Sequence, residues 1–161
     1  MSGEVTIRDA VPGDEERVAQ FVRALAAYEH LLHQVRGTAA DFSHALFGPR
    51  PRASALFAET DGQAVGFALW FYTFSTFAAR PGLYVEDVFV IAEHRRRGIG
   101  RMIFRDLARR ALVEGCARME WSVLNWNAPA IGFYRLIGAR PVDDWTAQRL
   151  DGEALLAFAG A

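Results

Sequence analysis

Three arginines and two glycines form the part of the sequence best suited to binding an anion. The run is Arg95, Arg96, Arg97, Gly98, Ile99 and Gly100, and it follows strand-like residues and precedes a helical pattern. Glycines leave the backbone accessible, and the amides and positive dipole at the start of a helix converge on an anion. Arginines add bidentate donors around the same point. The pattern therefore predicts a pyrophosphate site, although it is neither the dinucleotide fingerprint nor a nucleoside-triphosphate loop.

The same arginines would also suit a solvated basic run or a contact with nucleic acid. The 18 basic and 19 acidic residues, however, leave a formal charge of -1. Domains that bind polyanions usually carry a clear basic excess. The basic run is therefore a local feature, and we expect no nucleic-acid partner.

Two adjacent carboxylates, Glu86 and Asp87, interrupt an otherwise apolar strand just upstream. A carboxylate at such a place can serve as a general base, or it can simply pair with an arginine. In a regular strand the two side chains point to opposite faces. Both reach one ligand only if the strand bulges at this point.

The elements that must position these residues follow from hydrophobic periodicity and turn signals. Four strands are predicted at residues 4–10, in the two arms of a hairpin around Asp61-Gly62, and at 83–91. Helices are predicted from an Asp14 cap to about Leu32, from Thr38 to Phe47, and from Ile99 to Gly115. A strand at 118–124, a helix from Asn127 to Gly138, and a last strand reaching Leu150 before a short apolar tail complete the order. Helices interleaved with a mixed sheet predict an α/β or α+β single domain, residues 1–161.

The run at 95–100 resembles the (Gln/Arg)-x-x-Gly-x-(Gly/Ala) signature of the GCN5-related N-acetyltransferases (GNAT). The segments YVEDVFV, GIG and NWNAPAIGFYRLIGA follow in that family's order and spacing. The resemblance implies the GNAT fold, in which helices flank a mixed, mostly antiparallel sheet, and acetyl-CoA as cosubstrate. It implies a cofactor site made of Val88, Phe89, Val90, Arg95, Arg96, Arg97, Gly98, Ile99, Gly100, Arg101, Asn127 and Tyr134.

Among these enzymes the chain most resembles the diamine (spermidine/spermine) acetyltransferase branch, and the likeness extends back to LAAYEHLLHQV. The resemblance gives Glu86 the role of general base, directly or through water, and Tyr134 the role of general acid. It also places Trp145 near the acceptor. Where the branch has an acidic pair after Tyr28-Glu29, this sequence has Leu32 and His33.

Polyamines carry several positive charges, so the loss of that acidic pair bears on the acceptor. The remaining candidates for substrate binding are Glu29, Glu86, Asp87 and Trp145, with Asp143 or Asp144 beside it. We expect a small primary amine, either a diamine or a lysine-like amino acid. A protein N-terminal or lysine acetyltransferase and a non-catalytic acyl-CoA-binding module are the alternatives.

The remaining expectations concern partners and location. The resemblance implies a homodimer. His30 and His33 lack a third ligand, so no metal is expected. The apolar runs are shorter than the ~20 residues of a membrane span, so no membrane partner is expected. The N-terminus lacks a secretory pattern, and Cys116 is the lone cysteine, which fits a cytoplasmic protein.

Overall fold

The computed structural model describes residues 3–161, and the chain divides into two compact units between Ser122 and Val123. The strands of the first unit are β1 (Thr6–Asp9), β2 (Ser54–Thr60), β3 (Gln63–Ser75), β4 (Arg80–Val90) and β5 (Met119–Trp121). Its helices are α1 (Glu15–Tyr28), α2 (Ala39–Phe47) and α3 (Ile99–Val113), with 3-10 turns η1 (Leu32–Gln34) and η2 (Ala92–His94).

The strands form one sheet in the order β1-β2-β3-β4-β5. The first four run antiparallel to their neighbours, whereas β5 runs parallel to β4. The last pairing covers only Leu83 to Val85 of β4, opposite Met119 to Trp121. The expected mixed, mostly antiparallel sheet is therefore confirmed, and β4 continues past the end of β5 toward residue 90.

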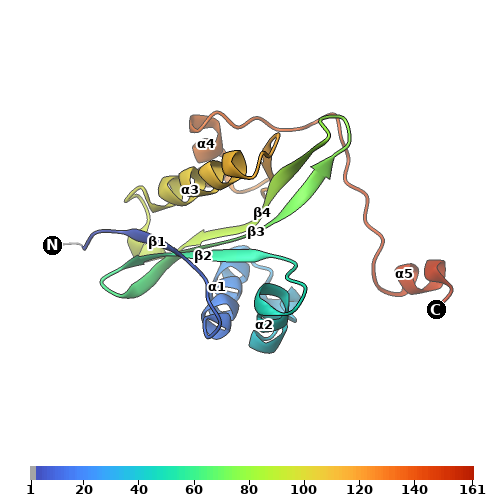
Figure 1. The fold of residues 1–161 in the computed structure, drawn as a ribbon, viewed down its shortest axis with the longest axis horizontal. Helices are drawn as coiled ribbons and strands as arrows, with labels where there is room; N and C mark the ends of the chain where they lie inside the picture. Colours follow the sequence, from blue (N-terminus) through green and yellow to red (C-terminus); the bar gives the residue numbers. More distant parts are fainter. Residues whose placement is uncertain (1–2) are drawn as a thin grey trace. The chain divides into compact units, whose positions relative to one another are not determined.

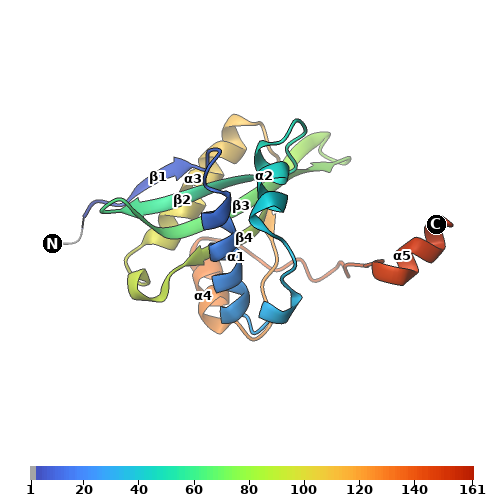
Figure 2. The ribbon, with the colours of Figure 1, turned by 90° about the horizontal axis from the view of Figure 1, so that it is seen from below.

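Helices cover both faces of the sheet, with α3 on one side and α1 and α2 on the other (Figures 1 and 2). Trp70, Leu83 and Val85 pack toward α3. Phe67, Leu69 and Phe89 pack toward α1 and α2. Because alternate strand residues feed the two cores, both faces of β3 and β4 are apolar, which is why these strands read as nearly continuous hydrophobic runs.

The first turn of α3 lies unusually close to the sheet because Gly66 of β3 has no side chain. A Cβ atom at Gly66 would stand 3.1 Å from Cδ1 of Ile103 and 3.2 Å from Cγ2 of Ile99. Ile99, Ile103, Leu107 and Ala111 form the buried stripe of the helix, as their spacing predicts. The N-terminal end of α3 is thus seated directly on β3.

Helix α1 is shorter than expected, because it ends at Tyr28 rather than near Leu32. His30 has φ of 61°, in the left-handed region. The amides of His30 and Leu31 donate to the carbonyls of Ala27 and Ala26, which is the Schellman pattern that closes a helix. Leu32 then begins η1 instead of continuing α1.

The turn signals have mixed outcomes. Asp61 and Gly62 both have positive φ and form the expected hairpin. Thr38 caps α2 with a reciprocal bond to Asp41. Asp14 precedes α1 but makes no cap, since its carboxylate accepts from Arg8 and from the Val11 amide.

The second unit holds α4 (Ala128–Leu136) and α5 (Gly152–Ala159). Asn127 caps α4 by accepting from the Ala130 amide, and Gly138 follows the helix with φ of 89°. The expected strand ending at Leu150 is wrong: residues 139–150 form no strand, and the apolar tail is the helix α5. A strand requires a pairing partner, and no strand within residues 3–161 pairs with this segment.

Candidate active site

A β-bulge in β4 brings Glu86 and Asp87 to the same face of the sheet. Trp70 of β3 pairs with Val85, and the preceding residue, Leu69, pairs with Asp87, so Glu86 is the extra residue. Val85 packs toward α3, and alternation then turns Glu86 toward α1. Asp87 shares the face of its partner Leu69, which also packs toward α1. The condition under which both carboxylates reach one ligand is therefore met.

A third carboxylate, Glu29, joins this face from the residue after α1. Burial, together with the negative charges of Glu86 and Glu29, raises the pKa of Asp87 to about 6. Burial also raises the pKa of Glu29. Glu86 itself is exposed. The three groups, which we call the carboxylate cluster, form an electronegative site suited to a cation.

Aromatic side chains flank the carboxylate cluster on the same face. The rings of Phe71 and Tyr84 pair with centroids 5.1 Å apart. The Tyr84 hydroxyl is 2.8 Å from Oγ of Ser122, just after β5, so this pair ties β4 to β5 two residues before Glu86. Sequence reasoning missed Tyr84 and Phe71 because only the register between β3 and β4 brings them together.

The glycine turn has the open backbone that a pyrophosphate requires. Gly98 precedes α3 in the left-handed region with φ of 78°. Among the described atoms, nothing lies within 4 Å of a Cβ placed on Gly98 or Gly100. The first amides of α3, from Ile99 to Arg101, are those that a helix leaves without an intrahelical acceptor. These features fit the diphosphate of an acyl-CoA.

The three arginines have different surroundings. Arg96 is exposed and has φ of 61°. Arg97 is also exposed, with Nη1 2.8 Å from Nδ1 of His94. Arg95 is exposed too, but it donates from Nε to the Val90 carbonyl at 2.8 Å. Its guanidinium carbon lies 4.7 Å from the ring centre of Tyr28 and 5.2 Å from that of Phe89.

The free edge of β4 faces away from β3. The Ile91 amide donates to the Val65 carbonyl, so alternation along the ladder turns the amides and carbonyls of Val88 and Val90 outward. No strand of residues 3–161 pairs with β4 beyond Val85 on that side. The Val88 backbone and the Val90 amide thus offer a strand edge for a pantetheine arm, although the Val90 carbonyl already accepts from Nε of Arg95. The Phe89 backbone faces β3, and its side chain packs toward α1.

The other predicted site residues belong to the second unit. Asn127 is buried, and its carbonyl oxygen caps α4. Tyr134 lies on α4 with its ring 5.7 Å from that of Phe133. Asp143, Asp144 and Trp145 are exposed and lie outside any helix or strand.

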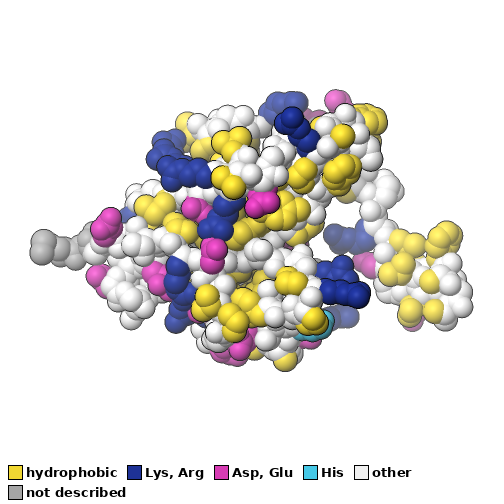
Figure 3. All heavy atoms as spheres, viewed as in Figure 1, with side chains coloured by type: hydrophobic (Ala, Val, Ile, Leu, Met, Phe, Trp, Pro, Cys, Tyr) yellow, Lys and Arg dark blue, Asp and Glu magenta, His cyan; other side chains and the backbone are white. Residues whose placement is uncertain are grey.

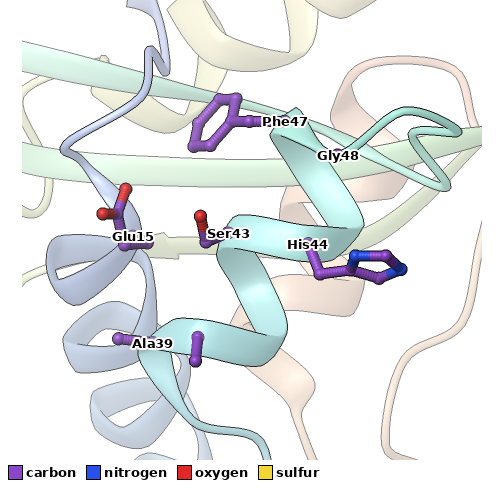
Figure 4. A pocket seen from close by; sticks show the side chains of 7 residues that line it. Glu15, Ala39, Ser43, His44, Phe47 and Gly48 are labelled. Carbon is purple, nitrogen blue, oxygen red and sulfur yellow. The ribbon is translucent and has the colours of Figure 1, made fainter.

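A hollow of about 540 Å³ lies apart from these residues, between the first turn of α1 and α2 (Figure 4). Glu15 and Ser43 line it, and His44 points away from both. Glu15 accepts from the Gly13 amide. The arrangement is not one that activates a serine, which needs a base within hydrogen-bonding reach.

Basic and acidic side chains are interspersed on the face shown in Figure 3. That distribution differs from the continuous basic stripe of a nucleic-acid-binding surface. Within residues 3–161, no helix has the length and hydropathy needed to span a bilayer.

Comparisons with known proteins agree with this geometry. The acetyltransferase (GNAT) family matches residues 21–139. The chain is 35% identical to the thialysine N-epsilon-acetyltransferase of Sus scrofa, over 97% of this chain and 98% of the relative. It is 31% identical to a spermidine/spermine N(1)-acetyltransferase-like protein of Homo sapiens, over 95% of this chain and 23% of the relative.

The fold also recurs in a solved structure, an integron cassette protein from the mobile metagenome of V. cholerae. The TM-score is 0.81 at 23% identity, covering 98% of each chain. Proteins of the GNAT family use acetyl-CoA as the acyl donor. The chain therefore belongs to the GCN5-related N-acetyltransferase family, in the branch that its sequence resembles, and is an acyltransferase.

Proposed function

We propose that the protein transfers the acetyl group of acetyl-CoA to the terminal primary amine of a small cationic acceptor, a lysine-like amino acid or a short diamine. The observation that carries the proposal is the bulge that gives Glu86 and Asp87 one common face with Glu29. Three carboxylates suit an ammonium group. The thialysine acetyltransferase relative supports a lysine-like acceptor.

Glu86 is the proposed general base. An alkyl amine with a pKa near 10.4 is mostly protonated at pH 7, and exposing its lone pair costs roughly 4.6 kcal/mol. Glu86 takes the ammonium proton, directly or through water, so that the nitrogen can attack the thioester carbonyl. Asp87 and Glu29 hold the cation beside it. Exposure of Glu86 leaves it accessible to solvent, to which the proton can pass.

Tyr134 is the proposed general acid. Acetyl-CoA supplies the thioester, and breaking its C–S bond leaves a thiolate. The Tyr134 hydroxyl donates its proton to that sulfur. The second proton, which the attacking nitrogen loses as the amide forms, passes through water and restores the phenol. The family likeness supports this role, because Tyr134 stands in α4, seven residues after the capping Asn127.

The acyl-CoA itself is proposed to bind at the glycine turn and at the edge of β4. The open space beside Gly98 and Gly100 supports pyrophosphate binding there. Ile99 and Arg101 contribute amides, and Arg96 and Arg97 contribute charge. Val88 and Val90 would pair with the pantetheine arm.

The acceptor is proposed to be short. Leu32 and His33 stand where the branch carries an acidic pair, and they lie in η1, just after the carboxylate cluster's Glu29. A long polyamine would have its distal ammonium groups near an apolar and an imidazole side chain. One terminal ammonium with one further polar group matches the available carboxylates better.

The test is release of free CoA with a panel of thialysine, lysine, ornithine, putrescine and spermidine. We expect turnover with the amino acids or the diamine at lower KM than with spermidine. Acetylated product must appear on the terminal nitrogen. Absence of turnover with every amine of the panel would contradict the proposed acceptor class.

A homodimer remains our proposal for the assembly. The apolar side chains of α5, Leu155, Leu156 and Phe158, are all exposed in the second unit, and this helix presents a largely apolar surface in Figure 3. Such a surface supports burial against another copy. Light scattering at micromolar concentration should give twice the mass of the 17.9 kDa chain.

A further inference from the structure

Arg95 opens the glycine turn, but its side chain lies against α1 and the edge of β4. Its Nε donates to the Val90 carbonyl at 2.8 Å. The guanidinium also covers two rings, at 4.7 Å from the centre of Tyr28 and 5.2 Å from that of Phe89. Those rings contact each other with centroids 6.2 Å apart. One side chain thus joins the turn to the last residue of α1.

The contacts of Arg95 differ from those of its neighbours Arg96 and Arg97. All three arginines are exposed, but among residues 3–161 only Arg95 of the three lies over aromatic rings. A guanidinium that stacks on two rings and donates to a carbonyl is held in one orientation, because its planar fork has few compatible positions. Arg95 therefore contacts other parts of the protein, whereas the side chains of Arg96 and Arg97 remain available to bind phosphates.

The rings under Arg95 belong to the same local structure as the carboxylate cluster. Tyr28 directly precedes Glu29, and the helix ends there, so the position of Glu29 depends on the closing turn and on what packs on Tyr28. Phe89 lies two residues after Asp87 on the same face of β4. A shift of Tyr28 would move Glu29 relative to Asp87, whose pKa its charge affects.

We propose that Arg95 is a positioning residue that couples the glycine turn to the carboxylate cluster, so that CoA bound at the turn orders the end of α1 for the acceptor amine. The role in acceptor binding rests on the proposed function. The coupling itself does not, because it concerns CoA and Tyr28. Because such linkage is reciprocal, an acceptor held by the cluster should in turn tighten CoA binding.

Hydrogen exchange tests the coupling without any acceptor. In the wild type, adding CoA should slow exchange of the amides of residues 27–36 by about threefold or more. Arg95→Ala should lose that protection while exchange in the first turn of α3 still responds to CoA. Arg105→Ala, an exposed arginine on α3, should behave as the wild type. Equal protection of residues 27–36 in Arg95→Ala would overturn the proposal.

Steady-state kinetics with the best amine of the panel test the consequence for the acceptor. Arg95→Ala should raise the KM for the amine about tenfold and the KM for acetyl-CoA less than about threefold. Arg96→Ala should show the reverse pattern. Arg95→Lys should recover part of the loss, because an ammonium keeps the cation–π contact. If Arg95→Ala raises only the KM for acetyl-CoA, Arg95 is a phosphate ligand and the proposal fails.

A double-mutant cycle identifies the contact responsible. Tyr28→Leu should raise the KM for the amine as Arg95→Ala does, and Tyr28→Phe should retain wild-type values because the ring is kept. The double variant Arg95→Ala/Tyr28→Leu should have a KM for the amine no higher than that of either single variant. Additive effects would show that the two residues act separately and would overturn the proposal. If the wild type acetylates none of the amines but CoA still protects residues 27–36 through Arg95, the proposed function fails and the coupling stands.

Discussion

Glu86 and Asp87 are adjacent in β4, yet both side chains lie on the face of the sheet that α1 covers. The cause is a single extra residue in the ladder, between the pairs Trp70–Val85 and Leu69–Asp87. The bulge leaves one carboxylate exposed and the other partly buried. Adjacent acids therefore acquire different environments, and different environments are what allow like groups to take different chemical roles.

The first prediction concerns the stability cost of ionising Asp87. Its folded-state pKa of about 6 exceeds the ordinary value of 3.8, so the stabilising state is the protonated one. That contribution is present below about pH 4 and is lost as the pH rises through about 6. Asp87→Asn should therefore raise the free energy of unfolding of the unliganded protein by about 1–3 kcal/mol at pH 8. Urea denaturation at pH 8 and at pH 4 measures the difference.

The matched control for Asp87→Asn is the same change at an exposed position of the second unit, Asp144→Asn. It should alter the free energy of unfolding by less than about 0.5 kcal/mol at either pH. A gain from Asp87→Asn that is equally large at pH 4 and at pH 8 would show that burial of charge is not its cause.

The second prediction separates the base from the acid and from acceptor binding. Glu86→Gln and Tyr134→Phe should each lower kcat by roughly 10²-fold or more, because each removes a proton-transfer group. Asp87→Asn should mainly raise the KM for the amine. Initial rates measured over a pH series, together with calorimetric titration of CoA, distinguish these effects.

If these roles are right, Glu86→Gln and Tyr134→Phe must still bind CoA with an affinity within about threefold of the wild type. With Glu86→Gln, the rate should recover partly at high pH, where more of the amine is already neutral. Full activity of both variants with every accepted amine would refute the assigned roles.

The third prediction contrasts the two glycines of the turn. Gly98 has φ of 78°, so Gly98→Ala should lower the free energy of unfolding by about 1–2 kcal/mol. It should also weaken CoA binding at least about tenfold, because the turn that presents the amides must distort. Gly100 lies inside α3 at an ordinary φ, so Gly100→Ala should stabilise the helix by about 0.5 kcal/mol. Thermal unfolding and calorimetric titration of CoA measure both effects.

Gly100→Ala also serves as the control for Gly98→Ala, because the family signature admits alanine at that place. Its CoA affinity should stay within a few-fold of the wild type. Equal loss of CoA binding in both variants would mean that the space beside the backbone matters, rather than the left-handed conformation of Gly98.

Local signals predicted most of the fold. The four-residue spacing from Ile99 to Ala111, the Asp61-Gly62 hairpin and the Thr38 capping box all describe interactions between near neighbours in the chain. The bulge at Glu86 is different, because it depends on how β4 pairs with β3. From the sequence we could predict only that a bulge, if present, would bring both carboxylates to one face.

The incorrect expectations also have physical causes. The left-handed residue that ends α1 is His30, where glycine is the usual signal. Asp14 has the right residue type for a cap, but Arg8 and the Val11 amide occupy its carboxylate. The Arg95–Tyr28 contact joins residues 67 positions apart in the sequence, so no spacing rule indicates it.

The last prediction concerns Asp14, whose pKa moves opposite to that of Asp87. The Arg8 guanidinium, 2.6 Å away, and the Val11 amide hold the pKa of Asp14 below its ordinary value of 3.8. The ionised form is therefore the stabilising one, present above about pH 4 and lost as the pH falls. Asp14→Asn should lower the free energy of unfolding by about 1–3 kcal/mol at pH 7, because Arg8 loses its buried partner.

Measuring the free energy of unfolding as the pH is lowered checks the sign of the Asp14 effect. The difference between the wild type and Asp14→Asn should shrink as the pH falls below about 4, while the gain from Asp87→Asn disappears over the range between about 6 and 4. Glu16→Gln, at an exposed carboxylate in the same helical turn, should cost less than about 0.5 kcal/mol. A loss in Asp14→Asn that persists unchanged at low pH would assign the stabilisation to packing of the Asp14 side chain rather than to its charge.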